Sequence, residues 1–222
     1  MTIEFDLSNM SGVNCYCSDE AAAILRKRAA AAGCSGIHLL GSGNFHYISL
    51  FFLELIKEDF SLLLIDRHPD MEKGAFEEGD NLILSCGNWV RIAQKKLPYL
   101  KKVYCFGTDE GLFSEALSDD PALSGFAFLI REPSQIEAGL PVYLSIDKDA
   151  LSSDICLTDW DQGNMELPEL FSFLEETGKE HTLLGADICG NTMRPVSDDI
   201  LKKNRDSDQM IIDFVSEAFF FS

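Results

Sequence analysis

Two short segments of the chain place acidic and imidazole side chains at two-residue spacing. DRHPD carries Asp66, His68 and Asp70, and SIDKD carries Asp147 and Asp149. In an extended segment alternate side chains point the same way, so each segment can aim its ligand atoms into one crevice. Carboxylates gathered in one crevice repel one another and raise each other's pKa unless cations neutralise them. The spacing therefore predicts a site for divalent cations.

The donor atoms narrow the choice of metal. A second imidazole comes from His46, which follows the Gly-rich stretch GSGNF. A site with many carboxylate oxygens and two imidazoles suits Mn²⁺ best, and Mg²⁺, Fe²⁺, Co²⁺ and Zn²⁺ are compatible with it. We therefore expect two divalent metal ions, most readily Mn²⁺, with six ligand residues: His46, Asp66, His68, Asp70, Asp147 and Asp149.

Apolar runs that alternate with helical patterns must position these side chains. Strands are expected over 36–40, 60–65, near 103, near 126, over 141–146 and from 182, and helices over 19–32, over 46–58, after 88, from 168 and from about 207. This alternation predicts one α/β domain over residues 1–222, a three-layer αβα fold with a doubly wound, mainly parallel sheet. Each ligand group follows a strand, so all would lie at the carboxyl edge, where such sheets bind ligands.

Each group also has an ordinary structural explanation when it is taken alone. A D-x-H-x-D segment on a loop is usually a solvated turn, a D-x-D segment is weaker evidence still, and His46 could cap or pack at a helix start. Their occurrence in order at one sheet edge favours metal binding, because unrelated surface charges have no reason to gather there.

GSGNFH, DRHPD and SIDKD resemble, in this order, the GGxH, DAHxD and SxDxD motifs of the ureohydrolases: arginase, agmatinase and formiminoglutamase. These enzymes form a superfamily with the histone deacetylase-like amidohydrolases, and the resemblance spans roughly residues 41–187. It implies one metal at His46, Asp66, Asp70 and Asp147, and a second at Asp66, His68, Asp147 and Asp149. It also implies that a water between the metals ionises and attacks an amidine or amide carbon, while Asp70 accepts the proton and later returns it.

The chain departs from arginase where arginase binds its substrate. Val90 stands where the resemblance places a histidine, and Gly190 where it places the glutamate that binds guanidinium. TDWDQG, residues 158–163, replaces a Gly-rich loop. LSCGNW, SIDKDAL, DWDQG and GADICG together resemble a divergent, poorly characterised bacterial branch of the arginase family.

Five further residues are candidates for contacting the substrate. Asp159 and Asp161 could bind a cationic head group on which Trp160 stacks, and the alternative is a polar turn with one anchoring tryptophan. Asn88 and Trp89 could line the pocket, although Trp89 could equally pack in the core.

Composition limits the partners. A formal net charge of −19 argues against nucleic acid and anionic membranes, and leaves a small-molecule substrate, with a cationic one favoured by the acidic loop. The seven cysteines lack CxxC spacing and the N-terminus has no signal-peptide pattern, so we expect a cytoplasmic protein. The apolar tail FVSEAFFF fits a core or a subunit interface, which leaves a homo-oligomer open.

Three functions are compatible with these residues. The first is a metal-dependent hydrolase of a linear C–N bond in an amidine or guanidine. The second is a deacetylase-like amide hydrolase, which the glycine at position 190 favours. The third is a metal-binding protein without turnover, against which the retention of all six ligand residues counts.

Overall fold

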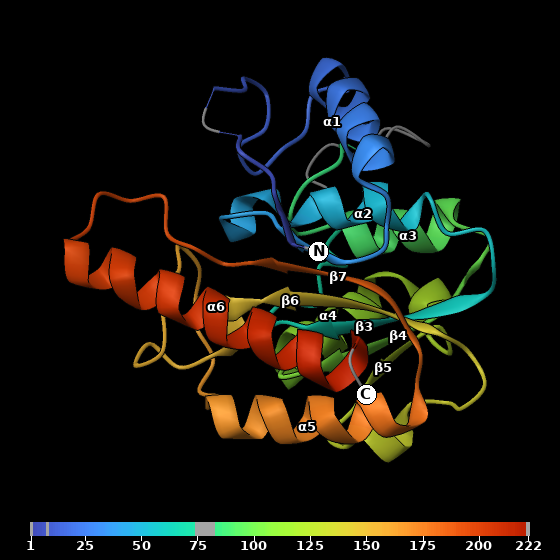
Figure 1. The fold of residues 1–222 in the computed structure, drawn as a ribbon. Coiled ribbons are helices and arrows are strands. Elements are labelled where there is room, and N and C mark those ends of the chain that lie inside the picture. The colour runs from blue at the N-terminus through green and yellow to red at the C-terminus, as the bar shows by residue number, and fades with distance from the viewer. Residues whose placement is uncertain (1, 8, 74–82, 221–222) are drawn as a thin grey trace.

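A computed structural model describes residues 2–7, 9–73 and 83–220, and its strands form a single parallel sheet (Figure 1). The strands are β1 (Thr2–Glu4), β2 (Ile37–Leu39), β3 (Phe60–Ile65), β4 (Leu100–Phe106), β5 (Ala127–Leu129), β6 (Val142–Asp147) and β7 (Leu183–Cys189). Their order across the sheet is β1-β2-β7-β6-β3-β4-β5, and every neighbouring pair is parallel. The predicted parallel sheet is confirmed.

Helices cover both faces of this sheet. They are α1 (Asp19–Ala32), α2 (Ser49–Leu53), α3 (Trp89–Lys96), α4 (Glu110–Asp119), α5 (Leu167–Glu180) and α6 (Asp198–Phe220), with 3₁₀ helices η1 (Gly43–Ile48), η2 (Pro121–Leu123), η3 (Pro133–Gln135) and η4 (Lys148–Ala150). Figure 1 shows α1, α2 and α3 above the strands and α5 below them. The predicted three-layer αβα arrangement is therefore confirmed.

The central strand β3 packs against helices on both of its faces. All its residues are buried, as expected for a strand covered on both faces. Leu62 and Leu64 belong to the core shared with α1 to α4, while Leu63 and Ile65 belong to the core shared with α5 and α6. Successive side chains of one strand thus serve opposite cores.

Some helix boundaries differ from the prediction. The helix expected over 46–58 is a 3₁₀ helix followed by α2, which ends at Leu53. The 3₁₀ helix begins before His46 because the Ser42 hydroxyl accepts the Asn44 N–H and caps it. The last helix begins at Asp198 rather than near 207, because its first turns are polar and show no apolar period. Neither β1 nor α4 was predicted.

The strand order decides where the site can form. β2, β7, β6 and β3 are consecutive neighbours, so the segments that leave their carboxyl ends meet at one edge. These segments carry the predicted ligand residues. Within the described part of the chain, no helix combines the length and apolarity needed to cross a membrane.

Candidate metal centre

The six predicted ligand side chains line one pocket at the carboxyl edge of the sheet. His46 comes from η1, the DRHPD residues follow β3, and Asp147 and Asp149 lie at and just after the end of β6. The pocket encloses about 670 Å³ with its open mouth included. All the predicted ligand residues except His68 are buried.

The first group of donor atoms surrounds the His46 ring. Its Nδ1 lies 2.9 Å from Asp70 Oδ2, 3.1 Å from Asp66 Oδ2 and 3.7 Å from Asp147 Oδ2. Three carboxylate oxygens from two different strand ends therefore face one ring nitrogen. This is a donor set that fits a hard divalent cation.

The second group surrounds the His68 ring. Its Nδ1 lies 2.8 Å from Asp149 Oδ2 and 3.7 Å from Asp66 Oδ1. Asp66 thus turns one oxygen toward each histidine, so its carboxylate lies between the two groups. Each of the two groups could hold a metal ion, and Asp66 belongs to both.

Local backbone hydrogen bonds fix these carboxylates. Asp66 Oδ1 accepts the His68 N–H at 2.6 Å, and Asp147 Oδ1 accepts the Asp149 N–H at 2.9 Å. Each is a short turn in which an aspartate accepts from the residue two positions on. Asp70 has a φ of +52°, a left-handed conformation rare outside glycine, and this turns its carboxylate toward His46.

A buried hydroxyl and a buried carboxylate support His46 from behind. Because the Ser145 hydroxyl donates its own proton to Asp187, it accepts from the Nε2–H of His46, which lies 2.8 Å away. Ser145 Oγ donates in turn to Asp187 Oδ1 at 2.7 Å, and Ser49 Oγ donates to the same oxygen at 2.9 Å. Metal-binding histidines are usually oriented by such partners. The sequence motifs contained Ser145 and Asp187, but nothing in their spacing showed that they meet.

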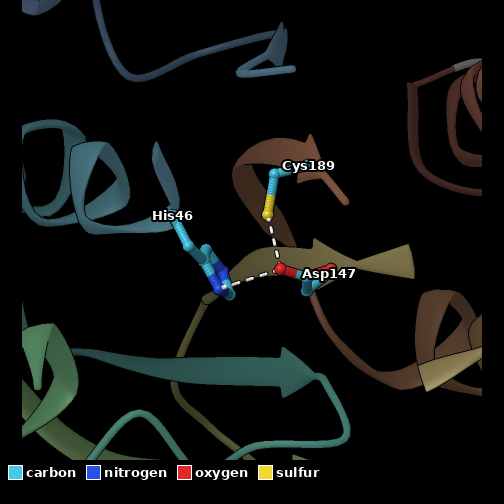
Figure 2. A group of neighbouring side chains, drawn as sticks. All are labelled: His46, Asp147 and Cys189. Carbon is cyan, nitrogen blue, oxygen red and sulfur yellow. Dashed lines mark hydrogen bonds and ion pairs between the residues drawn. The ribbon is translucent and has the colours of Figure 1, made fainter. Parts of the chain in front are cut away.

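Cys189 approaches the same group from β7. Its Sγ lies 3.1 Å from Asp147 Oδ2, and Figure 2 shows this thiol and His46 both directed at the Asp147 carboxylate. The parallel pairing of Asp147 with Cys189 across β6 and β7 produces this contact. Cys189 is buried, and its thiol touches the site.

Without cations the site strongly favours bound protons. Burial, followed by the charge of Asp149, raises the pKa of Asp147 to about 6. Burial and then the charge of Asp66 raise the pKa of Asp149 to about 7. Burial lowers the pKa of His68, but hydrogen bonds to Asp149 and Asp66 outweigh it and raise that pKa to about 11. Cations that replace these protons would remove the repulsion among the carboxylates.

Of the predicted substrate-contacting residues, Trp160 lines the pocket. Its ring lies edge-on to His68 with centroids 6.0 Å apart, and its Nε1–H donates to Asn44 Oδ1 at 2.8 Å. Asp159 instead accepts from the Thr192 hydroxyl and the Met193 N–H, and Asp161 is exposed outside the pocket lining.

The two predicted residues of the LSCGNW segment lie behind the pocket wall. Asn88 bonds to the backbone of Ser85 and Ile83. Trp89 is fully buried, and its Nε1–H donates to Asp70 Oδ2 at 2.5 Å. Trp89 therefore positions a carboxylate of the site and does not face the cavity.

The two departures from arginase have structural reasons. Val90 is fully buried in the core on the α1–α4 side of the sheet. Gly190 has a φ of +101°, and a Cβ there would lie 2.5 Å from Asp147 Oδ1 and 2.6 Å from the Lys148 backbone nitrogen. No larger side chain fits at position 190 while Asp147 stays in place.

Comparison with known proteins shows a family to which this chain belongs. An uncharacterized protein of Thermotoga maritima is 33% identical over 190 residues, which cover 83% of this chain and 68% of that protein. The chain belongs to the same family as this Thermotoga protein. No model of a known protein family matches the chain.

Solved structures identify the fold of this family. Proclavaminate amidino hydrolase from Streptomyces clavuligerus superposes with a TM-score of 0.68 at 12% identity, covering 90% of this chain and 71% of its own. A triple mutant of T. brucei arginase-like protein bound with Mn²⁺ gives 0.66 at 18% identity, covering 97% and 71%. Arginase from Medicago truncatula gives 0.65 at 15% identity, covering 90% and 66%. The ureohydrolase fold expected from three short motifs is confirmed.

Proposed function

We propose that this ureohydrolase-fold protein is a metal-dependent hydrolase that cleaves a linear C–N bond, of the amidine or guanidine type, with two divalent ions. One observation carries the proposal. Two histidine rings from separate segments each face carboxylate oxygens in one open pocket, and Asp66 turns one oxygen to each ring. A purely structural acidic cluster would not need both imidazoles to face the carboxylates inside a cavity.

Bound divalent ions would supply a water that is acidic near neutral pH, and so a nucleophile. Asp70 is the proposed proton acceptor, because its carboxylate lines the pocket among the donor atoms and Trp89 holds its Oδ2 in place. In the hydrolysis the oxygen of water bonds to the carbon and the C–N bond breaks. The proton held by Asp70 passes to the departing nitrogen, which leaves as an amine.

Metal content tests the site directly. We expect about two Mn²⁺ per chain after loading and dialysis, measured by plasma mass spectrometry. Asp66→Ala and Asp147→Ala should each lose bound metal, since both carboxylates lie among the donor atoms described above. Asp154→Ala, which removes an exposed carboxylate outside the pocket lining, is the matched control. Unchanged metal content in the first two variants would remove the basis of the proposal.

Turnover tests the reaction. The Mn²⁺-loaded protein should hydrolyse at least one member of a panel of guanidines, amidines and acyl-amines, and Asp70→Asn should abolish that activity. A protein that binds two Mn²⁺ but turns over no member of the panel would instead be a metal-binding protein without catalysis.

A specific observation favours an amide hydrolase as the second candidate. Position 190 cannot carry the carboxylate that the arginase resemblance calls for, because Asp147 and the Lys148 backbone occupy the space of a side chain. An amide carbonyl is neutral and needs no such partner. Release of acetate or another acid, in place of urea or an amidine-derived product, would identify this alternative.

A further inference from the structure

The thiol of Cys189 lies among the first group of donor atoms. Its Sγ, an Asp147 carboxylate oxygen and a ring nitrogen of His46 lie within 4.8 Å of one another. The thiol is 3.1 Å from Asp147 Oδ2, and the same oxygen is 3.7 Å from His46 Nδ1. Figure 2 shows the thiol and the imidazole approaching this carboxylate from different elements. A cation beside Asp147 Oδ2 would therefore have nitrogen, oxygen and sulfur donors within reach.

The backbone holds this thiol at the end of β7. Asp147 and Cys189 are paired across β6 and β7, and Cys189 is 1% exposed. Two positions on, the Asn191 N–H donates to the Gly41 carbonyl oxygen at 2.8 Å, and Gly190 leaves the space beside Asp147 free of a side chain. The thiol and the carboxylate thus meet through the register of the sheet.

Other cysteines of the chain do not occupy such a position. Cys15 and Cys86 line the pocket, but within the described residues neither belongs to a group that could hold a metal ion. Cys156 is buried, and its Sγ donates to the Lys148 carbonyl oxygen at 3.5 Å. Burial alone therefore does not bring a thiol among the donor atoms.

Sulfur makes the two groups of donor atoms unequal. The second group, of Asp66, His68 and Asp149, offers nitrogen and oxygen alone. Thiolate is a soft ligand that favours Zn²⁺, whereas Mn²⁺ prefers carboxylate oxygens. We expected Mn²⁺ from nitrogen and oxygen donors, and Cys189 adds a sulfur that changes this preference at one of the two positions.

We propose that Cys189 supplies a thiolate ligand to the metal held by the first group, and that this sulfur raises the preference of that position for Zn²⁺ over Mn²⁺. The inference rests on the metal centre of the proposed function and adds a ligand to it. On binding, the S–H bond breaks, the sulfur bonds to the metal ion, and the proton passes to solvent. The competing explanation is a thiol that only donates a hydrogen bond to Asp147 Oδ2.

The absorption spectrum of bound Co²⁺ reports a sulfur ligand. Metal-free protein loaded with Co²⁺ in the absence of oxygen should show a near-ultraviolet thiolate-to-cobalt charge-transfer band. Cys189→Ser should lose this band, although its hydroxyl can still donate to Asp147 Oδ2, so a role limited to the hydrogen bond is preserved. Cys86→Ser, which removes a buried thiol of the pocket wall, is the matched control and should keep the band.

Competition between metals measures the preference. Zn²⁺ binds nitrogen and oxygen sites more tightly than Mn²⁺ in any case, so the diagnostic quantity is the change caused by removing the sulfur. Cys189→Ser should lower Zn²⁺ affinity about 10-fold or more, because even groups behind a ligand contribute about 10- to 100-fold. It should leave Mn²⁺ affinity nearly unchanged. X-ray absorption of the Zn²⁺-loaded parent protein should show a sulfur neighbour at about 2.3 Å, a measurement that needs no variant to fold.

The results separate this inference from the proposed function. Two Co²⁺ per chain without a charge-transfer band, or bound Zn²⁺ without a sulfur neighbour, would reject Cys189 as a ligand and uphold the metal centre. A band lost in Cys86→Ser but kept in Cys189→Ser would do the same. A parent protein that binds no divalent ion would reject both.

Discussion

At the scale of single residues, the orientation of His46 depends on one hydroxyl. Ser145 Oγ accepts from His46 Nε2 and donates to Asp187, so it fixes which ring nitrogen faces the pocket. Ser145→Ala should lower Mn²⁺ affinity about 10- to 100-fold, the usual effect of removing a partner behind a metal ligand. Calorimetric titration of the metal-free protein with Mn²⁺ measures this change in affinity.

A neighbouring serine provides the matched control. Ser61 lies on β3, is equally buried, and its hydroxyl has no hydrogen-bond partner in the described residues. Ser61→Ala should therefore leave Mn²⁺ affinity unchanged. Equal losses in the two variants would mean that Ser145 acts through packing of the sheet and not through His46.

The candidate ligands could be predicted at this scale, but their supports could not. The two-residue spacing of DRHPD is visible in the sequence, although a turn at Asp66 and the left-handed conformation of Asp70 bring these side chains together, in place of the extended segment that we expected. The contact between Ser145 and Asp187 depends instead on the register of β6 against β7. That register is set by long-range packing, which motif spacing does not report.

At the scale of elements, Lys148 joins the segment after β6 to α6. The side chain is fully buried, and its Nζ lies 2.6 Å from Asp208 Oδ1 and donates to Ser207 Oγ and the Asn204 carbonyl oxygen. Lys148→Met leaves these groups without their cation. Because breaking a buried pair from one side costs about 3–5 kcal/mol, the free energy of unfolding should fall by about 3 kcal/mol in urea denaturation.

Lys203→Met is the control for this element. Lys203 also lies on α6, but it is only partly buried, and its ammonium donates to the Ser153 carbonyl oxygen at an exposed site. Its replacement should change stability by less than about 0.5 kcal/mol. A small effect of Lys148→Met would show that α6 is held by its apolar residues alone.

The prediction of elements succeeded where a pattern of apolar residues existed. β3 was placed at its observed bounds because all of its residues are apolar or small and buried. The start of α6 was placed too late, since its first turns are stabilised by polar contacts such as those of Lys148 and the ion pair between Lys202 and Asp206. Hydrophobic periodicity does not record such contacts. α4 begins at Glu110 and is capped by Asp109, whose carboxylate accepts two backbone N–H groups.

At the scale of the whole molecule, the parallel sheet brings carboxylates close together, and their mutual repulsion lowers the stability of the folded protein when they are ionised. Asp147 and Asp149 have pKa values of about 6 and about 7 in the folded state, against 3.8 for an ordinary aspartate. A carboxyl group whose pKa is higher in the folded than in the unfolded protein stabilises the fold at pH values below its unfolded pKa. This stabilisation is lost as pH rises through the pKa of the folded state. The pKa of His68 is raised from 6.5 to about 11, so this residue also contributes less stability as pH rises, but only above pH 6.5.

The metal-free protein should therefore lose stability as pH rises from about 4 to about 7. Urea denaturation in a chelator at several pH values in this range measures the loss. Asp149→Asn removes one of the two groups and the charge that raises the pKa of Asp147, so its stability should fall less steeply with pH. Asp154→Asn removes an exposed carboxylate and should keep the steep dependence. An equal slope in all three proteins would place the pH dependence outside the pocket.

Adding Mn²⁺ to the same samples links this pH dependence to the proposed site. Cations replace the protons that the carboxylates otherwise retain, and they bind the folded state alone, so they should restore about 2.7 kcal/mol at a free concentration one hundred times the dissociation constant. At one fixed Mn²⁺ concentration the gain should be larger at pH 7 than at pH 5, because protons compete for the same oxygens and weaken Mn²⁺ binding at the lower pH. Asp149→Asn should show a smaller gain than the parent protein. If Mn²⁺ stabilised the parent and Asp149→Asn equally at both pH values, the metal would be bound away from these carboxylates, and the acidic edge of the sheet would need another explanation.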